Sequence, residues 1–180
     1  PDLTERNLME KTDISPEQAI REALVYEKRI RDMYKEAAAK TQDPTAIKLF
    51  GALAKDEQGH VDYLEHRLTQ LETEGQVTVD TVPSVLSPKA FDRMVEKVEG
   101  RLDRDDRKDE KQMLSNALHA EVETSAFYRQ MVERMTGPLQ DMFSRFMEIE
   151  DGHVTMVQAE LDYLSNTGFW FDFQEFDMEH

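Results

Sequence analysis

The chain carries the sequence EQGHV at residues 57–61 and repeats it, with one substitution, as EDGHV at residues 150–154. In both copies a glutamate precedes a histidine by three residues, and residues three apart share one face of an α-helix. A partner glutamate precedes each copy: Glu27 lies 30 residues before Glu57, and Glu121 lies 29 residues before Glu150. The chain therefore contains an internal repeat, about residues 16–74 and 105–166.

Four long segments around these motifs have apolar residues at steps of three and four, which predicts amphipathic helices. Ser15, Pro16 and Gln18 form the pattern of a helix start with a capping box. Gly75 is a typical helix stop. The helices are expected to span about residues 16–40, 44–74, 105–135 and 138–165.

The connection between the second and third helices is long. Residues 75–87 lose the helical pattern and are expected to be extended, and a short helix is expected from Ser87 to near Gly100. A crossover of this length allows the second and third long helices to run parallel. The predicted fold is all-α: an antiparallel four-helix bundle with a long helix 2–3 crossover that contains a short extra helix.

Composition supports one domain and narrows the function. A chain of 180 residues suits a single core, and a net charge of −16 argues against nucleic acid and membrane as partners. The chain has no cysteine, which excludes disulfides and thiolate metal sites. No stretch has the length of a membrane span or a signal-peptide core, so a cytoplasmic location is expected.

A glutamate interrupts each of the four apolar stripes at a core position. An isolated buried carboxylate costs several kcal/mol or becomes protonated, and four together repel unless cations lie between them. Two divalent ions would balance four carboxylates, with two neutral imidazoles completing the ligand set. The sequence therefore predicts a two-metal site with the ligands Glu27, Glu57, His60, Glu121, Glu150 and His153.

A single Glu-x-x-His step is more often a solvated helix face than a metal site. Here two such steps, two partner glutamates and their placement on apolar stripes occur together, which favours the metal site. His66 and His119 lack this pattern and are expected to be ordinary surface or boundary residues.

Tyr34 and Tyr128 each follow the first glutamate of a repeat by seven residues. Each is either a core tyrosine whose hydroxyl needs a partner or a donor to a ligand carboxylate, and both roles can hold. Asp56 is a further candidate for orienting a ligand histidine. Gly59 and Gly152, next to the histidines, are expected to allow close packing or to leave space beside the metals.

At these residues the sequence resembles the ferritin-like superfamily and, within it, the rubrerythrin-type proteins, from about Glu17 to Asn166. The resemblance implies two iron ions, although manganese and zinc also accept oxygen and nitrogen ligands. It implies that Glu27, Glu57 and His60 serve one half of the site, and that the other half is served by Glu121, Glu150 and His153. The bridging glutamates would be either Glu57 and Glu150 or Glu27 and Glu121.

The resemblance further implies an oxidoreductase that reacts with hydrogen peroxide or oxygen. The long connection and the aromatic tail favour a small homo-oligomer, expected to be a dimer. Two departures stand out. The chain lacks the rubredoxin cysteines, so electrons would come from an external donor. Thr124 stands where rubrerythrins tend to place an extra glutamate, and Glu123 is expected to point away from the site.

Two other classes of function remain open at this stage. One class is a metal-dependent protein of another kind. It could be a ferroxidase or another iron-handling or storage protein, or a quinone or lipid hydroxylase, which uses a related ligand set. The other is a non-catalytic interaction module, suggested by the C-terminal tail, residues 167–180, with five aromatic residues within eight positions. The tail is expected to pack on the bundle or across a dimer interface.

Overall fold

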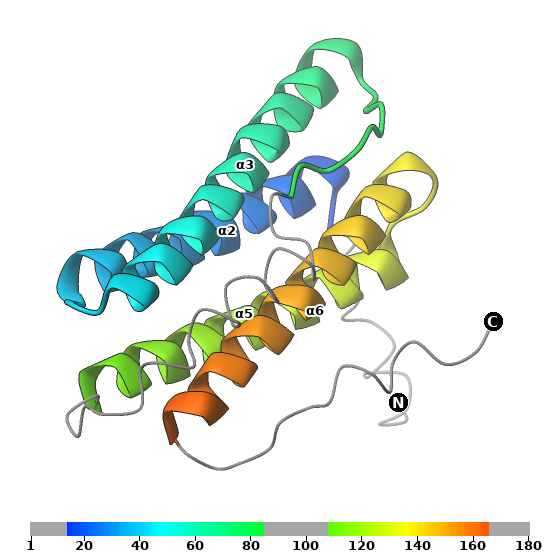
Figure 1. Cartoon of the computed structure of the whole chain (residues 1–180). Coiled ribbons are helices and arrows are strands. Elements are labelled where there is room, and N and C mark those ends of the chain that lie inside the picture. The colour runs from blue at the N-terminus through cyan, green and yellow to red at the C-terminus, as the bar shows by residue number, and fades with distance from the viewer. Residues whose placement is uncertain (1–13, 85–107, 166–180) are drawn as a thin grey trace, which may run out of the picture.

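The computed structural model describes residues 14–84 and 108–165. These residues form four α-helices, and the described part of the chain contains no β-strand (Figure 1). The helices are α2 (Pro16–Lys40), α3 (Pro44–Glu74), α5 (Lys108–Arg134) and α6 (Pro138–Ser165). The prediction of an all-α helical bundle is confirmed, whereas the short helix expected from Ser87 to Gly100 and the tail at 167–180 lie outside the described residues.

The helix boundaries follow the local sequence signals. Ser15 caps α2: its hydroxyl accepts from the Gln18 backbone N–H at 3.2 Å, and the Gln18 side chain accepts from the Ser15 backbone N–H at 3.0 Å. Gly75, after α3, and Gly137, before α6, have φ angles of 71° and 59°. Glycine adopts this left-handed conformation without the penalty that a Cβ atom imposes. The predicted capping box and glycine stop are both confirmed.

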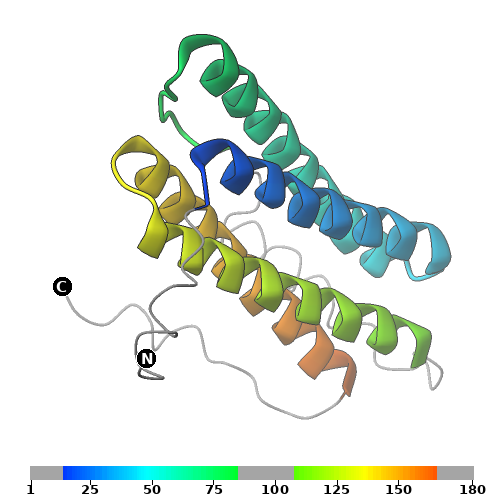
Figure 2. The same cartoon turned by 180° about the vertical axis from the view of Figure 1, so that it is seen from behind.

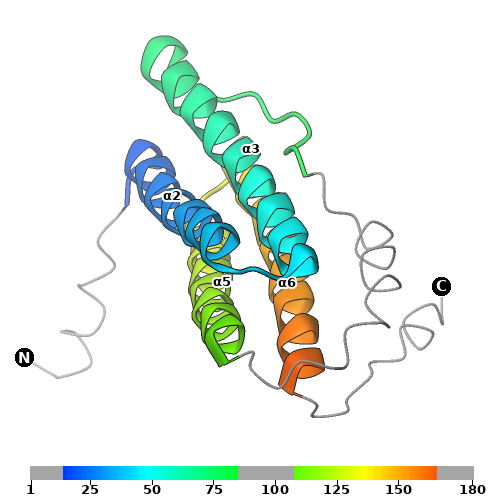
Figure 3. The ribbon, with the colours of Figure 1, turned by 60° about the vertical axis from the view of Figure 1, so that its left-hand side comes forward.

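The four helices form two antiparallel pairs, α2 with α3 and α5 with α6, and α2 lies alongside α5 (Figures 2 and 3). Hydrogen bonds join Tyr34 to Glu121 and Tyr128 to Glu27. Residue numbers rise along α2 as they fall along α5, so these two helices are antiparallel. It follows that α3 and α5 run parallel, as the long crossover predicts.

Apolar side chains form two clusters on either side of the predicted metal ligands along the bundle axis. One cluster includes Ile20, Leu64, Tyr128, Phe143 and Phe146. The other includes Ile30, Phe50, Leu53, Leu114 and Val157. The ligand residues lie between the two clusters in the sequence of every helix, so the apolar core surrounds the polar centre on both sides.

The first part of the crossover packs back onto α3. Val77 and Val82 are buried in the first apolar cluster. Arg67 binds the Thr78 hydroxyl at 3.2 Å, pairs with Asp80 and lies over the Tyr63 ring at 4.6 Å from its centroid. These contacts fix the path of residues 77–84 over one side of the bundle.

The two glycines beside the ligand histidines are in different surroundings. A Cβ atom on Gly59 would meet the Pro83 ring at 3.7 Å, an ordinary contact distance. A Cβ atom on Gly152 would meet no described atom within 4 Å. Gly59 thus lies under the crossover rather than under a neighbouring helix.

Among the described helices, none has a stretch apolar and long enough to cross a lipid bilayer.

Phe143→Ala should lower the free energy of unfolding by about 3–5 kcal/mol, because it empties a fully buried site. Val25→Ala is the matched control: Val25 is 67% exposed, so its truncation should change stability by less than about 0.5 kcal/mol. Urea unfolding of the three proteins measures both values, and equal losses for the two variants would contradict the placement of the core.

Candidate metal centre

Six polar side chains meet at the middle of the bundle, and all are at most 1% exposed. One comes from α2, two from α3, one from α5 and two from α6, because each helix carries its glutamate in the apolar stripe that faces the core. The structure brings together all six predicted ligands: Glu27, Glu57, His60, Glu121, Glu150 and His153.

The six residues form two overlapping groups. Glu27, Glu57, His60 and Glu150 offer one set of ligand atoms that lie within 4.8 Å of one another, and Glu57, Glu121, Glu150 and His153 offer a second such set. Glu57 and Glu150 belong to both sets. Of the two alternatives left open by the sequence, the geometry therefore favours Glu57 and Glu150 as the bridging pair.

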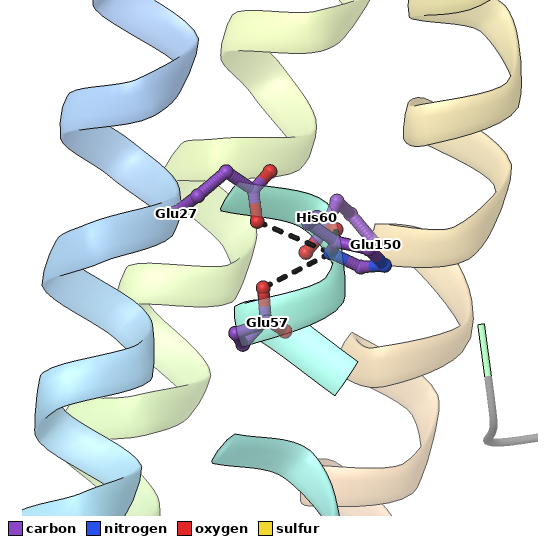
Figure 4. A group of neighbouring side chains, drawn as sticks. All are labelled: Glu27, Glu57, His60 and Glu150. Atoms are coloured by element: carbon purple, nitrogen blue, oxygen red, sulfur yellow. Dashed lines mark hydrogen bonds and ion pairs between the residues drawn. The ribbon is translucent and has the colours of Figure 1, made fainter. Parts of the chain in front are cut away.

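Both histidines turn the same ring nitrogen toward the carboxylates. His60 Nδ1 lies 3.1 Å from oxygens of Glu27 and Glu57 and 3.4 Å from Glu150 (Figure 4). His153 Nδ1 lies 2.8 Å from Glu57, 3.5 Å from Glu150 and 3.8 Å from Glu121. The two imidazoles are nearly parallel, with ring centroids 5.7 Å apart. Each half of the site thus presents one nitrogen and several oxygens.

Several of these buried atoms have no hydrogen-bond partner among the described residues. His153 Nδ1 and Glu57 Oε1 are only 2.8 Å apart but are not aligned for a hydrogen bond, and both Glu150 oxygens also lack one. An unsatisfied buried polar atom costs about 1–3 kcal/mol. Ligand atoms about 2.1 Å from a common ion lie about 3 Å apart when they meet at right angles. The donor set fits divalent cations.

Burial and mutual repulsion alter the acid–base behaviour of the carboxyl groups. Burial raises the pKa of the Glu57 carboxyl, and the Glu27 charge adds to the rise. Burial and the nearby Glu150 raise the pKa of Glu121 well above its usual range. Protons therefore remain on these carboxyl groups at a higher pH than on exposed glutamates.

The histidines shift in the same direction for the opposite reason. Burial lowers the pKa of His60, but the carboxylates of Glu57 and Glu27 outweigh it and raise the pKa well above its usual value. For His153, Glu57 and Glu150 likewise outweigh burial. In the metal-free protein the site thus retains protons, which a bound cation would displace.

The two predicted tyrosines form a crossed pair of hydrogen bonds between the halves of the repeat. Tyr34 on α2 donates to Glu121 on α5, and Tyr128 on α5 donates to Glu27 on α2. Both rings are fully buried. Burial and the adjacent carboxylate raise both phenol pKa values, so the hydroxyls stay protonated. Both roles weighed from the sequence therefore hold: core packing and donation to a carboxylate of the site.

Asp56, the further candidate on α3, lies behind His153. Its Oδ2 atom is 3.0 Å from His153 Nε2 and accepts a hydrogen bond of 2.8 Å from the Ser84 hydroxyl. Ser84 lies in the crossover, where no periodicity links it to the motifs, so the sequence did not reveal it.

Three side chains were expected to lie apart from the site, and all three do so: Glu123, His66 and His119. The Glu123 side chain is 42% exposed and pairs with Arg29 at 2.6 Å and His119 at 3.2 Å. Thr124 is buried and donates to the Ala120 carbonyl at 2.9 Å. His66 is exposed, as is His119. No fifth carboxylate therefore joins the group from this turn of α5.

The chain matches no model of a known protein family, and no curated protein or solved structure is significantly similar to it. The assignment of a metal centre rests on the repeated motif and on the geometry of the buried donors.

Tyr34→Phe should lower the free energy of unfolding by about 1–3 kcal/mol, because Glu121 loses a hydrogen-bond donor inside the core. Tyr26→Phe is the control, since the partly buried Tyr26 packs on Phe127 and shows no hydrogen bond through its hydroxyl among the described residues. Chemical unfolding of the metal-free proteins measures the difference. Equal stability of Tyr34→Phe and wild type would contradict the crossed hydrogen bonds.

The melting temperature of the metal-free protein should fall as the pH rises above about 6.5, the ordinary pKa of histidine. The folded-state pKa values of His60, His153 and Glu121 are raised, so the native state binds more protons than the unfolded state and loses stability as they leave. Thermal melts at high salt, which screens the surface charges, separate this effect from general repulsion. A melting temperature that rises over this range would contradict it.

Proposed function

We propose that this protein is a di-iron carboxylate oxidoreductase with a ferritin-like, rubrerythrin-type bundle, and that it reacts with hydrogen peroxide or oxygen. The observation that carries the proposal is the pair of overlapping ligand groups that share Glu57 and Glu150. The internal repeat and the crossed tyrosines support it, because they place equivalent donors around two adjacent positions.

Iron is the proposed metal. Carboxylate oxygens and imidazole nitrogens suit iron, and manganese and zinc remain chemically compatible with the same donors. Two ferrous ions, when bound, supply two electrons, the number required to reduce one hydrogen peroxide molecule with two protons to two water molecules. The resemblance to rubrerythrins favours iron over the other two metals.

The chain's own residues provide the setting for this chemistry. Four carboxylates would offset the charge of two divalent cations, and Glu57 and Glu150, which belong to both ligand groups, would be available to both ions. Tyr34 and Tyr128 restrain the two outer glutamates by hydrogen bonds. The apolar clusters on either side exclude bulk water from the ligands.

Electrons would come from an external donor, because the chain has no cysteine that could hold a rubredoxin-type iron. We further propose a cytoplasmic protein that forms a small homo-oligomer, a dimer in the simplest case. Its net charge of −16 disfavours nucleic acid and anionic membranes as partners.

A ferroxidase or iron-handling role is the alternative. Thr124 favours it, since this turn of α5 offers no extra carboxylate of the kind that rubrerythrins use with peroxide. Gel filtration distinguishes a storage shell from a small oligomer, because a shell would elute at a far larger size.

Anaerobic titration of the metal-free protein with Fe(II) should end at two ions per chain, and peroxide should then oxidise the loaded protein faster than oxygen does. Glu57→Ala should reduce the stoichiometry, because it removes a ligand shared by both groups. Glu123→Ala, at an exposed residue of α5, is the matched control and should still bind two. Inertness toward both oxidants would end the oxidoreductase proposal.

A further inference from the structure

The two halves of the site repeat their ligands, but they differ in what lies behind each histidine. His153 Nε2 is 3.0 Å from the carboxylate of Asp56. His60 Nε2 has no hydrogen-bond partner among the described residues. In each histidine the Nδ1 atom faces the carboxylates and the Nε2 atom lies on the opposite side of the ring. The two ligand histidines are therefore equivalent toward the carboxylates but differ in the hydrogen-bond partner of Nε2.

The difference originates at a single position of the repeat. Asp56 directly precedes Glu57 on α3, and the residue that directly precedes Glu150 on α6 is Ile149. Ile149 is partly buried and packs against the first apolar cluster. The His60 ring meets Phe146 edge-on at 5.3 Å between ring centroids. One histidine is therefore backed by a carboxylate, whereas the other has an aromatic ring as a neighbour and no described partner for its Nε2 atom.

A carboxylate that accepts a hydrogen bond from Nε2 of an imidazole makes the Nδ1 atom a stronger metal ligand. It holds the ring proton on Nε2, which leaves the Nδ1 lone pair free for a metal, and it increases the basicity of that nitrogen. It also fixes the orientation of the ring. His153 has this support before any ion binds, whereas no described group accepts a hydrogen bond from His60 Nε2 in the same tautomer.

Asp56 is itself held in place by the crossover. The Ser84 hydroxyl donates to the same Oδ2 atom that faces His153. The segment that carries Ser84 is anchored to α3 by the buried Val82 and by Arg67, which pairs with Asp80. Among the described residues, the support of His153 is thus part of a chain of contacts that runs from the crossover to its half of the site.

We propose that the two metal positions are unequal: the position formed with Glu121 and His153 binds its divalent cation more tightly and fills first, and Asp56 is the positioning residue that creates the difference. This inference rests on the proposed two-metal centre and adds to it an order of binding.

Cobalt(II), an oxygen-stable probe for divalent iron, tests the order by calorimetry and visible absorption. Wild-type protein should bind two ions in two distinct steps. His60→Ala should keep the tighter step, and His153→Ala should keep the weaker one.

Asp56→Ala should weaken the tighter step by about 10- to 100-fold, the usual effect of removing the carboxylate behind a ligand histidine. Asp56→Asn keeps the shape of the side chain and one acceptor oxygen, so it should lose less affinity at the tighter step. It replaces Asp56→Ala in the test if the alanine variant does not fold. Ser84→Ala should weaken the step less than Asp56→Ala, because the carboxylate remains. Lys55→Ala, at an exposed neighbour on α3, is the matched control and should leave both steps unchanged.

The possible failures are distinct. Binding of fewer than two cobalt ions by the wild-type protein would defeat the two-metal centre itself. Two other results would contradict only the proposed difference in affinity between the two positions. One is the binding of two ions with equal affinity. The other is a tighter step that disappears in His60→Ala and survives in His153→Ala. An unchanged tighter step in a folded Asp56→Asn or Asp56→Ala protein would remove Asp56 as its cause.

Discussion

The structure depends on one electrostatic constraint: four carboxylates lie in the fully buried middle of an acidic helical bundle. In a medium of low polarity four like charges cannot coexist at these separations without counter-charge. Bound protons supply part of this counter-charge, as the raised pKa values show for Glu57, Glu121, His60 and His153. Divalent cations would supply this counter-charge fully. They would also satisfy the oxygens of Glu150 and the Nδ1 atom of His153, which have no hydrogen bond among the described residues.

The rest of the bundle serves this centre. The crossed hydrogen bonds of Tyr34 and Tyr128 tie α2 to α5 and hold the outer glutamates at the same time. Large apolar side chains above and below, among them Phe50 and Phe146, supply the hydrophobic free energy that offsets a polar core. The same residues exclude water, which strengthens every electrostatic interaction inside.

The sequence predicted the helices and the six donors because both depend on spacing within one helix. Steps of three and four define which face is buried, and Glu57 with His60 share such a step. Other features depend on packing between segments and could not be read from the sequence. They are the hydrogen bond from Tyr34 to Glu121 on another helix, the membership of Glu57 and Glu150 in both ligand groups, and the contact of Ser84 with Asp56. The family-level assignment and the reaction remain predictions.

A duplicated motif does not require a symmetric site. One turn after the first glutamate of each half, the chain places Ile30 and Thr124, and neither is a carboxylate, so the six donors stay balanced between the halves. The crossover, however, is unique in the chain. Residues 77–84 lie over α3, place Pro83 beside Gly59 and bring Ser84 to Asp56. The asymmetry of the centre therefore begins with Asp56, whose counterpart in the repeat is Ile149, and the crossover reinforces it through the contact of Ser84 with Asp56.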